Sequence, residues 1–320
     1  MNLLVTGGAG FIGSNFIRYM LRAHPDCRIV NLDSLTYAGN LNNLKDCDSS
    51  PRYTFVRGDI CDSPLVNSVM EEHLIDTVVH FAAESHVDRS IADASAFVKT
   101  NILGTYTLLE AARQHALHRF VHISTDEVYG SIPEGSFRET DVLSPSSPYS
   151  SSKAGSDLLA LSYFTTYNLP VIVTRCTNNF GPYQFPEKLI PLFVTNLING
   201  KKVPVYGTGK NIRDWIHVND HCQAVDFLLD RGDAGEIYNI GGENERTNLE
   251  ITEKILRILK KDDSLIEHVH DRPGHDFRYS LDCSKIKALG WKPGHSFEEG
   301  LEDTLSWYVQ NEWWWRPLKK

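Results

Sequence analysis

The stretch NLLVTGGAGFIGS, residues 2–14, decides the fold of this 320-residue chain. Its apolar first part predicts a buried β-strand at 2–6, and the glycine-rich part opens a predicted helix at 11–23. The glycines with the spacing G-x-x-G-x-x-G are Gly7, Gly10 and Gly13. Glycine at such positions permits a tight turn and the close approach of a pyrophosphate, which the amides at the helix N-terminus bind. The stretch therefore predicts a dinucleotide-binding strand–turn–helix unit.

Outward from this unit, short apolar runs alternate with longer amphipathic stretches. The further strands expected in the first half are 28–33, 53–56, 77–81, 120–124 and 171–175. The further helices expected there are 64–73, 94–115 and 150–167. This alternation predicts an α/β fold with a doubly wound parallel sheet whose strands are buried on both faces, and the dinucleotide-binding unit makes it a Rossmann fold.

The pattern changes after Arg175, where segment 178–186 is rich in turn formers and predicts a loop or a domain crossing. Beyond it we expect helices near 187–199, 220–229, 249–259 and 297–311, and strands near 213–217 and 236–240. We predict an NAD-binding domain over residues 1–176, with segment 213–240 returning to its sheet. Residues 177–320 are expected mainly to form a smaller α/β domain that binds the substrate.

Composition limits the class of protein. The net charge of −9 argues against nucleic acid as a partner. No segment approaches the roughly 20 apolar residues that cross a bilayer, and the N-terminus lacks the basic region of a signal peptide. The six cysteines are scattered without a Cys-x-x-Cys pair, which favours buried reduced thiols over zinc or disulfides. We therefore expect a cytoplasmic protein with no metal site and no membrane association.

Residues at the carboxyl ends of the predicted strands are the next candidates for cofactor binding. Asp33 ends the second strand about twenty residues after the last glycine. A carboxylate there accepts hydrogen bonds from an adenosine ribose and repels a 2′-phosphate, which favours NAD over NADP; capping of a loop is the alternative. The strand-end candidates that follow are Asp59, which can equally be a turn residue, with Ile60, Phe81, Ala82 and Ala83.

Tyr149 and Lys153 lie four residues apart on a predicted helix, so both project from one face. An ammonium beside a phenol lowers its pKa and makes it a usable base, and it also reaches the cofactor ribose. With the glycine loop and with Thr125 at a strand end, this pair predicts hydride transfer to or from an alcohol. Such chemistry needs no carboxylates, yet Asp126 and Glu127 directly follow Thr125.

The chain resembles the extended short-chain dehydrogenase/reductase family, and within it the nucleotide-sugar 4,6-dehydratases that act on dTDP-glucose. The motifs that carry the resemblance are GGAGFIG (7–13), FAAESHVDRS (81–90), STDEVYG (124–130), YSSSK (149–153), TRCTNNFGPYQFPEKLIP (174–191), IRDWIHV (212–218), YNIGG (238–242) and DRPGHD (271–276). They span nearly the whole chain. Thr177 and Phe180 stand where the family commonly has serine and tyrosine, and Phe277 stands where it has arginine.

The resemblance explains the two acids. It implies that the hexose is oxidised at C4, with Tyr149 accepting the hydroxyl proton and Thr125 positioning it. The 4-ketone acidifies the C5 proton, which Glu127 removes while Asp126 protonates the departing C6 hydroxyl. The hydride then returns to C6, which leaves dTDP-4-keto-6-deoxyglucose and water. Two carboxylates are needed because elimination requires a base and an acid together.

The resemblance also implies the rest of the site. The candidates for the diphosphate are Lys188, Arg213, Arg272 and His275, although Arg213 can alternatively form an ion pair with Asp214. The other expected substrate contacts are Ser85, Thr125, Asn178, Leu189, Pro204, Tyr206 and Asn248, of which Asn248 can instead cap a helix. The remaining NAD contacts expected are Phe11, Ile12, Leu35, Thr36, Thr100 and Asn179.

Three alternative functions share parts of this pattern. A UDP-sugar 4-epimerase needs Tyr149 and Lys153 but not the two acids. A 4,6-dehydratase of a UDP- or GDP-linked sugar keeps the acids and changes the base pocket, whereas a non-enzymatic NAD-binding protein has no reason to keep the whole set. The resemblance further implies a homodimer formed by the helices at 94–115 and 150–167, whose apolar faces can alternatively belong to the core.

Overall fold

The computed structural model describes residues 1–271 and 276–319. Its centre is a seven-stranded sheet in the order β11-β6-β5-β4-β1-β2-β3, with every neighbouring pair parallel. These strands are β1 (Asn2–Thr6), β2 (Arg28–Asp33), β3 (Tyr53–Arg57), β4 (Thr77–His80), β5 (Arg119–Thr125), β6 (Val171–Cys176) and β11 (Ile237–Ile240). The predicted α/β fold with a parallel Rossmann sheet is confirmed.

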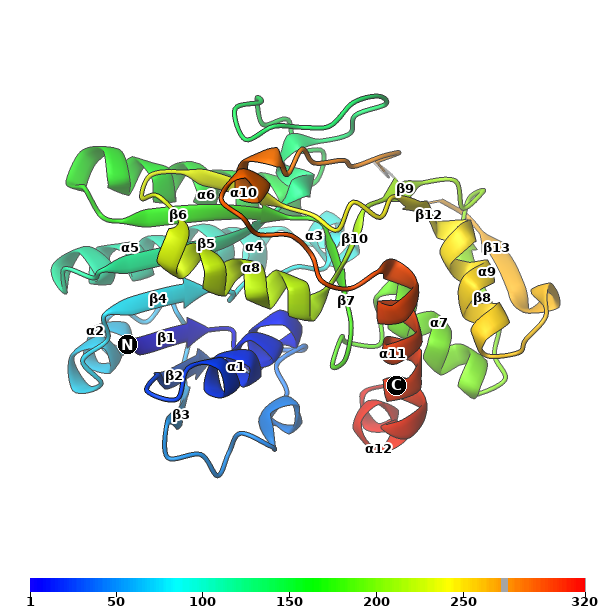
Figure 1. Cartoon of the computed structure of the whole chain (residues 1–320), viewed down its shortest axis with the longest axis horizontal. Helices are drawn as coiled ribbons and strands as arrows, with labels where there is room; N and C mark the ends of the chain where they lie inside the picture. The colour runs from blue at the N-terminus through cyan, green and yellow to red at the C-terminus, as the bar shows by residue number, and fades with distance from the viewer. Residues whose placement is uncertain (272–275, 320) are drawn as a thin grey trace.

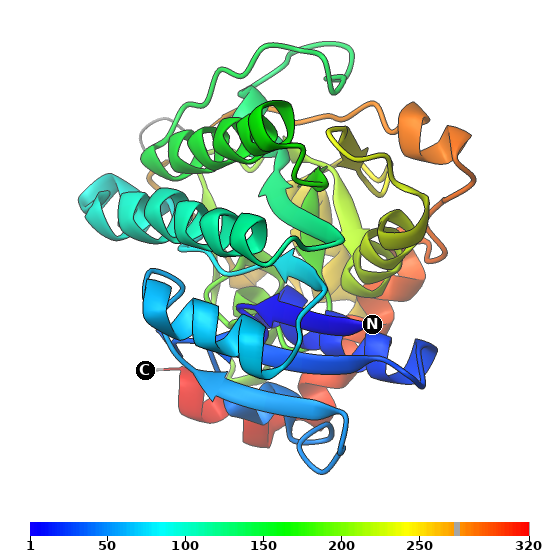
Figure 2. The ribbon, with the colours of Figure 1, turned by 90° about the vertical axis from the view of Figure 1, so that its left-hand side faces the viewer.

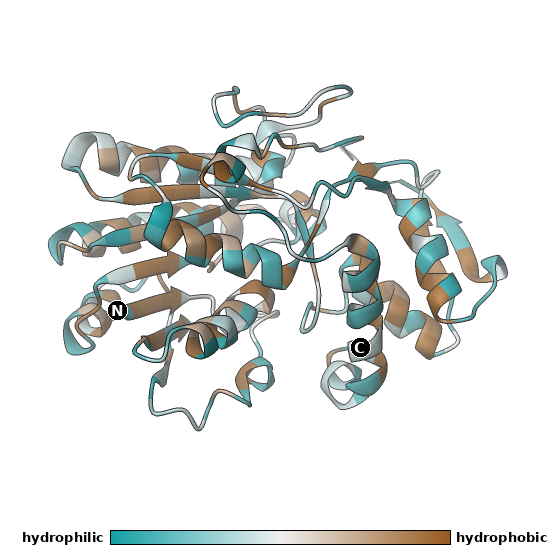
Figure 3. Ribbon diagram, in the orientation of Figure 1, coloured by the Kyte–Doolittle hydropathy of each residue, from teal (hydrophilic) through white to brown (hydrophobic). Residues whose placement is uncertain are grey.

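Helices cover both faces of this sheet (Figure 2). On one face lie α1 (Phe11–Ala23) and α8 (Val218–Arg231), which contact each other. On the other lie α2 (Ser63–Glu72), α5 (Thr105–Gln114) and α6 (Pro148–Tyr167). Each face has its own apolar core, and Figure 3 shows the central strands as mainly hydrophobic. Burial on both faces explains why these strands are continuous apolar runs rather than alternating ones.

Local sequence signals start the helices that carry the predicted site. Gly10 precedes α1, and Gly7 adopts a φ of +69°, where a Cβ would lie 2.6 Å from the backbone of Ala82. Helix α6 begins with a capping box in which Ser147 and Ser150 exchange hydrogen bonds, followed by Pro148 in the first turn. The strand-to-helix turns are therefore defined by residues at the turns themselves.

The helix expected at 94–115 is not uniform. It consists of α4 (Ser95–Phe97), a π-helical segment η2 (Val98–Gly104) and α5. Within η2 the amide of Asn101 donates to the carbonyl of Glu84 and to Ser152 Oγ, and its oxygen accepts from the backbone N–H of Glu84. Wider π-helical turns are common beside functional sites, and here the turn ties α6 to the loop after β4.

The second half of the chain adds a third apolar core beside the carboxyl ends of the sheet (Figure 1). Its helices are α7 (Leu189–Ile198), α9 (Asn248–Ile258), α11 (Phe297–Gln310) and α12 (Glu312–Trp315). Its strands form the pairs β7 (Asn178–Phe180) with β10 (Trp215–His217), β8 (Val203–Tyr206) with β13 (Ile266–Val269), and β9 (Ile212–Arg213) with β12 (Arg246–Thr247). The strand expected at 213–217 is thus divided into β9 and β10.

Strand β11 lies in the main sheet beside β6, far along the chain from the first six strands. The division of the chain near residue 176 stays a prediction. Short elements complete the described structure, namely α3 (Val87–Ala92), α10 (Ser284–Ala288), η1 (Leu41–Leu44), η3 (Asp126–Tyr129), η4 (Asp263–Leu265) and η5 (Arg316–Leu318). None of the helices in the described part of the chain is both long and apolar enough to span a membrane.

Candidate active site

A cavity of about 530 Å³ lies at the carboxyl ends of the central strands. The glycine loop and the ends of β2 and β4 line one part of it, and the end of β5 and the start of α6 line another. In parallel α/β sheets ligands bind at this edge. All five predicted catalytic residues line the cavity, namely Thr125, Asp126, Glu127, Tyr149 and Lys153.

The predicted cofactor residues border the same cavity, with one exception. Those in its lining are Gly7, Gly10, Phe11, Ile12, Gly13, Asp33, Thr36, Asp59, Ile60, Phe81, Ala82, Ala83, Thr100, Tyr149, Lys153 and Asn179. Leu35 does not line it, but its backbone N–H donates to Asp33. A Cβ on Gly13 would lie 2.4 Å from the carbonyl oxygen of Gly7, so the glycine spacing is required sterically.

The carboxylate of Asp33 joins the end of β2 to the glycine loop. Its Oδ2 accepts from the N–H of Ala9 at 2.9 Å, and its Oδ1 accepts from Leu35 at 2.8 Å. Burial raises the pKa of Asp33, and the two backbone hydrogen bonds oppose that effect. The structure thus contains the loop-capping contacts considered above. The same carboxylate lines the cavity, where its remaining lone pairs can accept ribose hydroxyls.

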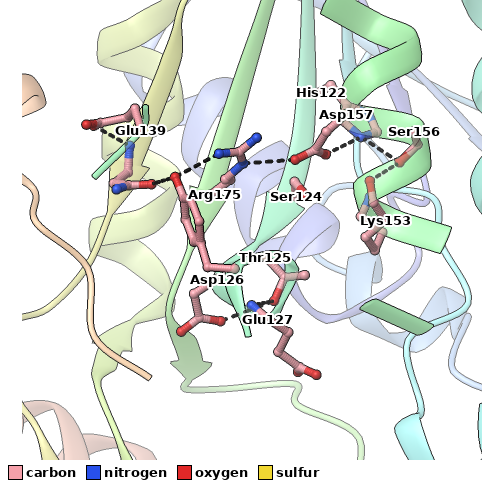
Figure 4. Close-up of polar contacts among 12 residues, drawn as sticks. His122, Ser124, Thr125, Asp126, Glu127, Glu139, Lys153, Ser156, Asp157 and Arg175 are labelled. Carbon is pink, nitrogen blue, oxygen red and sulfur yellow. Dashed lines mark hydrogen bonds and ion pairs between the residues drawn. The ribbon is translucent and has the colours of Figure 1, made fainter. Parts of the chain in front are cut away.

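Thr125 and the two acids form the turn between β5 and the 3₁₀ helix η3. Thr125 Oγ1 donates to Asp126 Oδ1 at 3.2 Å and accepts from the N–H of Glu127 at 3.3 Å. The two carboxylates diverge from this turn (Figure 4). Asp126 is 3% exposed, and its Oδ2 has no hydrogen-bond partner among the described residues. Burial and then the negative charge of Glu127 hold the pKa of Asp126 well above its usual range.

Tyr149 and Lys153 are both buried on the face of α6 that borders the cavity. Burial raises the pKa of Tyr149 well above its usual value. Burial also lowers the pKa of Lys153 to about 8, an effect that the charge of Asp157 opposes. Lys153 Nζ donates to the carbonyl of Ile123 at 2.7 Å, which holds the ammonium between α6 and β5.

Only some of the predicted substrate residues line the cavity. Ser85, Asn178 and Lys188 line the cavity, as does Thr125, and Lys188 Nζ donates to the carbonyl of Ser85 at 3.3 Å. The described cavity lining does not include Leu189, Pro204, Tyr206, Arg213 or Asn248. Arg272 and His275 lie outside the described residues.

Two alternatives from the sequence are wrong. The guanidinium of Arg213 donates to the carbonyls of Ile212 and Asp276, at 2.7 and 2.8 Å. The carboxylate of Asp214 accepts instead from backbone N–H groups of 242 and 244, so the two side chains form no ion pair in the described structure. The cap of α9 is Thr247, within a capping box, and Asn248 is the first residue of the helix.

The sequence reasoning missed several residues at this site. Arg89 on α3 stacks at 3.7 Å over the ring of Tyr37 and lies 3.4 Å from Glu187, so these contacts join the helix to two loops that line the cavity. Lys99 lies 3.0 Å from Asp59. No periodicity links such partners, because they are distant in sequence. The residue Asp157 did carry a signal, since it repeats the four-residue spacing of Tyr149 and Lys153.

Comparisons with known proteins agree with this geometry. A family model described as GDP-mannose 4,6 dehydratase matches residues 4–304. A dTDP-glucose 4,6-dehydratase of Streptomyces niveus is 56% identical over 324 residues, covering 100% of this chain and 96% of the relative. The crystal structure of the dTDP-glucose 4,6-dehydratase from Streptomyces venezuelae with NAD and TYD bound is 56% identical, covers 100% of both chains and has a TM-score of 0.97.

An epimerase shares the fold at lower identity. The UDP-glucose 4-epimerase of Thermus thermophilus, solved in complex with NAD, is 30% identical with a TM-score of 0.90, covering 97% of this chain and 100% of its own. The match to the family model extends over almost the whole chain, and the dehydratase relatives match at more than half of the aligned positions. The chain therefore belongs to the nucleotide-sugar 4,6-dehydratase family defined by the GDP-mannose 4,6 dehydratase model, together with the dTDP-glucose 4,6-dehydratases that it resembles over its full length.

Proposed function

We propose that this protein is a dTDP-glucose 4,6-dehydratase, an NAD-dependent hydro-lyase that converts dTDP-glucose to dTDP-4-keto-6-deoxyglucose and water. The observation that carries the proposal is the pair Asp126 and Glu127, held in one cavity with Tyr149 and Lys153. Hydride transfer requires Tyr149 and Lys153, and elimination requires Asp126 and Glu127. The relatives with the same name, at 54–56% identity, support the choice of reaction.

The residues at the glycine loop fit NAD. The close approach at Gly7 and Gly13 leaves backbone N–H groups at the start of α1 for a pyrophosphate. Asp33 at the end of β2 suits a ribose without a 2′-phosphate. When bound, NAD accepts hydride from C4 of the sugar and later returns it to C6. Net consumption of the cofactor is zero.

Tyr149 and Lys153 provide the base for the oxidation at C4. Tyr149 removes the hydroxyl proton, and its phenolate is stabilised by the ammonium of Lys153 in a buried environment where such an interaction is strong. Thr125 lies at the end of β5 in the same cavity and positions the hydroxyl. General base catalysis of this kind contributes roughly 10²–10⁴-fold to a rate.

The two acids divide the elimination between them. Burial and the charge of Glu127 raise the pKa of Asp126 well above its usual value, which favours the protonated form that serves as the acid for the leaving C6 hydroxyl. Glu127 is more exposed than Asp126 and acts as the base that removes the C5 proton, which the 4-ketone has acidified. Once hydride has reached C6, Glu127 returns a proton to C5.

We further propose that the protein is a cytoplasmic homodimer. Large apolar side chains are exposed on the neighbouring helical segments η2–α5 and α6, namely Val98, Leu103, Tyr106, Leu158 and Tyr167. Exposed apolar clusters of this kind favour an interface, and a two-fold arrangement would let each patch cover its copy. The six free cysteines suit a reducing compartment.

The direct test is to incubate the purified protein with dTDP-glucose and to identify the product by mass and NMR. We expect a 4-keto-6-deoxy sugar nucleotide and no accumulation of NADH. UDP-glucose and GDP-mannose serve as parallel substrates, and preferred conversion of either would reassign the base pocket. Formation of a C4 epimer without loss of water would identify an epimerase and contradict the proposal.

A further inference from the structure

A buried charged cluster lies directly behind the Tyr149–Lys153 pair. We call Asp157, Arg175 and His122 the buried triad. Asp157 is one helical turn after Lys153 on α6 and is fully buried. Its Oδ2 accepts from Arg175 Nε on β6 at 3.0 Å, and its Oδ1 lies 3.3 Å from His122 Nε2 on β5 (Figure 4).

Hydrogen bonds connect this triad to both halves of the candidate site. Ser156 Oγ lies 3.0 Å from His122 Nε2 and donates to the carbonyl of Lys153. On the other side, Arg175 Nη1 donates to the hydroxyl of Tyr129 at 2.8 Å, and Tyr129 belongs to the same 3₁₀ turn as the two acids. Hydrogen bonds therefore connect the triad both to the helix that carries the base pair and to the turn that carries the acid pair.

The charges around Lys153 come from several elements. The titratable groups that face it or the triad are Asp157 on α6, His122 on β5, His80 on β4, Arg175 and Cys176 on β6, and Tyr129 on η3. Burial, then the charge of Lys153, lowers the pKa of His122 to about 4, so this imidazole is neutral at pH 7. Burial raises the pKa of the Cys176 thiol to about 12, which keeps it protonated. Asp157 is the anion of this set.

An anion at this position has a specific consequence for the reaction. When the Tyr149–Lys153 pair has lost one proton, two forms are possible: phenolate with ammonium, or phenol with amine. Both forms contain the same number of protons, and such coupled sites titrate as a pair. Only the phenolate form can accept the C4 hydroxyl proton.

We propose that Asp157 is a positioning residue that favours the ammonium form of Lys153 and thereby raises the share of the pair in the active phenolate form. Asp157 is one turn from Lys153 and two turns from Tyr149 on the same helix, so its charge acts mainly on the lysine. Arg175 and His122 hold the carboxylate in place. This inference rests on the proposed C4 oxidation by the pair.

The electrostatics of the helix support this division. Burial lowers the pKa of Lys153, and the charge of Asp157 is the first influence that opposes it. The pKa of Tyr149 is raised first by burial and then by the negative charge of Glu127, and Asp157 is not among its causes. Removing the charge of Asp157 would therefore shift proton loss further toward the lysine and away from the phenol.

The test uses the holoenzyme of the variant Asp157→Asn in single-turnover mixing with dTDP-glucose across a pH series. We expect the plateau rate of bound NAD reduction to fall roughly tenfold to a thousandfold, since a nearby opposite charge shifts a pKa by about 1–3 units. We also expect the acid limb of the pH–rate profile, where the rate rises as the pair loses its first proton, to move to lower pH. The reason is that Lys153 then loses its proton more readily. Asp157→Glu should restore the limb toward that of the wild type.

Two controls separate this role from a structural one. Ser156→Ala removes the hydrogen bonds to His122 and to the Lys153 carbonyl without changing charge, and its acid limb should stay in place. The double variant Asp157→Asn/Arg175→Gln leaves no unpaired buried guanidinium, which guards against misfolding. Because it removes one negative and one positive charge together, its acid limb should lie closer to that of the wild type than the limb of Asp157→Asn does. A lower plateau with an unmoved acid limb in Asp157→Asn would overturn the inference.

A second readout does not depend on the substrate. The ultraviolet titration of the Tyr149 phenolate, taken as the difference between each protein and its Tyr149→Phe counterpart, should show less phenolate at mid-titration in Asp157→Asn. Equal phenolate in the variant and the wild type would overturn the inference even if the substrate were reassigned. Failure of the wild type to reduce its NAD with dTDP-glucose would contradict the proposed function alone.

Discussion

Thr125 Oγ1 donates to Asp126 Oδ1 at 3.2 Å, while the other carboxylate oxygen of Asp126 is buried without a hydrogen-bond partner among the described residues. One oxygen is thus oriented by the residue that ends β5. The other remains available to donate a proton if the group is protonated. Burial and the neighbouring Glu127 favour the protonated form, because both raise the pKa of Asp126. The turn therefore favours the protonated carboxyl group that a general acid requires.

The first prediction concerns Asp126→Asn. The amide keeps shape and hydrogen bonding but does not readily donate a proton, so we expect bound NAD to be reduced on mixing with dTDP-glucose and the reaction to stall before water is lost. Overall turnover should fall roughly 10²–10⁴-fold. Stopped-flow nicotinamide absorbance measures this, with Tyr149→Phe as the control that loses C4 oxidation. If both variants lost C4 oxidation equally, Asp126 would not be a separate elimination acid.

The second prediction concerns Glu127→Gln. Without this carboxylate no base removes the C5 proton, so we expect solvent deuterium to be absent from C5 in the sugar recovered after mixing in D₂O. The Thr125 hydrogen bond to the backbone N–H of residue 127 is independent of the side chain, so the turn should persist. Mass spectrometry and NMR of the sugar provide the measurement. Deuterium at C5 at the wild-type level would assign the base to another group.

The third prediction concerns cofactor choice. Asp33 lies at the end of β2 in a buried position, where its negative charge repels a 2′-phosphate. The stripped wild-type protein should therefore recover activity with NAD and little with NADP. Asp33→Ser should narrow that difference while also loosening the glycine loop, because the hydrogen bond to Ala9 is lost. Comparable activity of the wild type with both cofactors would refute the ribose assignment.

The fourth prediction concerns Arg213. Its guanidinium donates hydrogen bonds to the backbone carbonyls of residues 276 and 277 and lies 4.2 Å from the centre of the Tyr279 ring. Arg213→Ala should raise KM for dTDP-glucose about tenfold, because it removes a cation and the anchor of residues 276 and 277 at the end of the DRPGHD motif. Arg213→Lys keeps the positive charge but loses the planar guanidinium with its several donors, so it should raise KM by less than Arg213→Ala does. An unchanged KM in the alanine variant would exclude a role in diphosphate binding.

The fifth prediction concerns stability at acidic pH. Burial lowers the pKa of His122, His217 and His221 to about 4. The unfolded chain takes up these protons near pH 6.5, whereas the folded protein does not, so the unfolded state binds more protons between about pH 6.5 and 4. The free energy of unfolding should therefore be fully maintained above pH 6.5 and decrease as the pH falls to about 4.

Thermal unfolding followed by circular dichroism across this range provides the measurement. His221 is the cleanest single case, since burial is the cause of its shift and Asn179 is the neighbour of its Nδ1. His221→Gln should flatten the dependence on pH relative to the wild type. An identical slope in the two proteins would show that this imidazole does not contribute.

The sequence by itself determined the strand–glycine–helix unit at the N-terminus and the type of the other elements that have strong local signals. The predicted bounds 2–6 and 11–23 agree with β1 and α1, because the signals for these elements are local: an apolar run, glycines that allow the turn, and a helical period. For α6 the predicted end at 167 agrees, but the helix begins at Pro148 rather than at 150, directly after the cap Ser147. The candidate catalytic residues were also visible, since each follows a strand or lies one helical turn from the next.

Only the tertiary structure decided which distant residues meet. The strands β7, β8 and β13 are short and lack clear alternation, and their pairing partners are far along the chain. Likewise Asp157, Arg175 and His122 come from a helix and two strands, and nothing in their sequence spacing predicts contact between all three. Local propensity and periodicity act over one or two turns, whereas a buried charge is tolerated only where the whole fold brings its partners together.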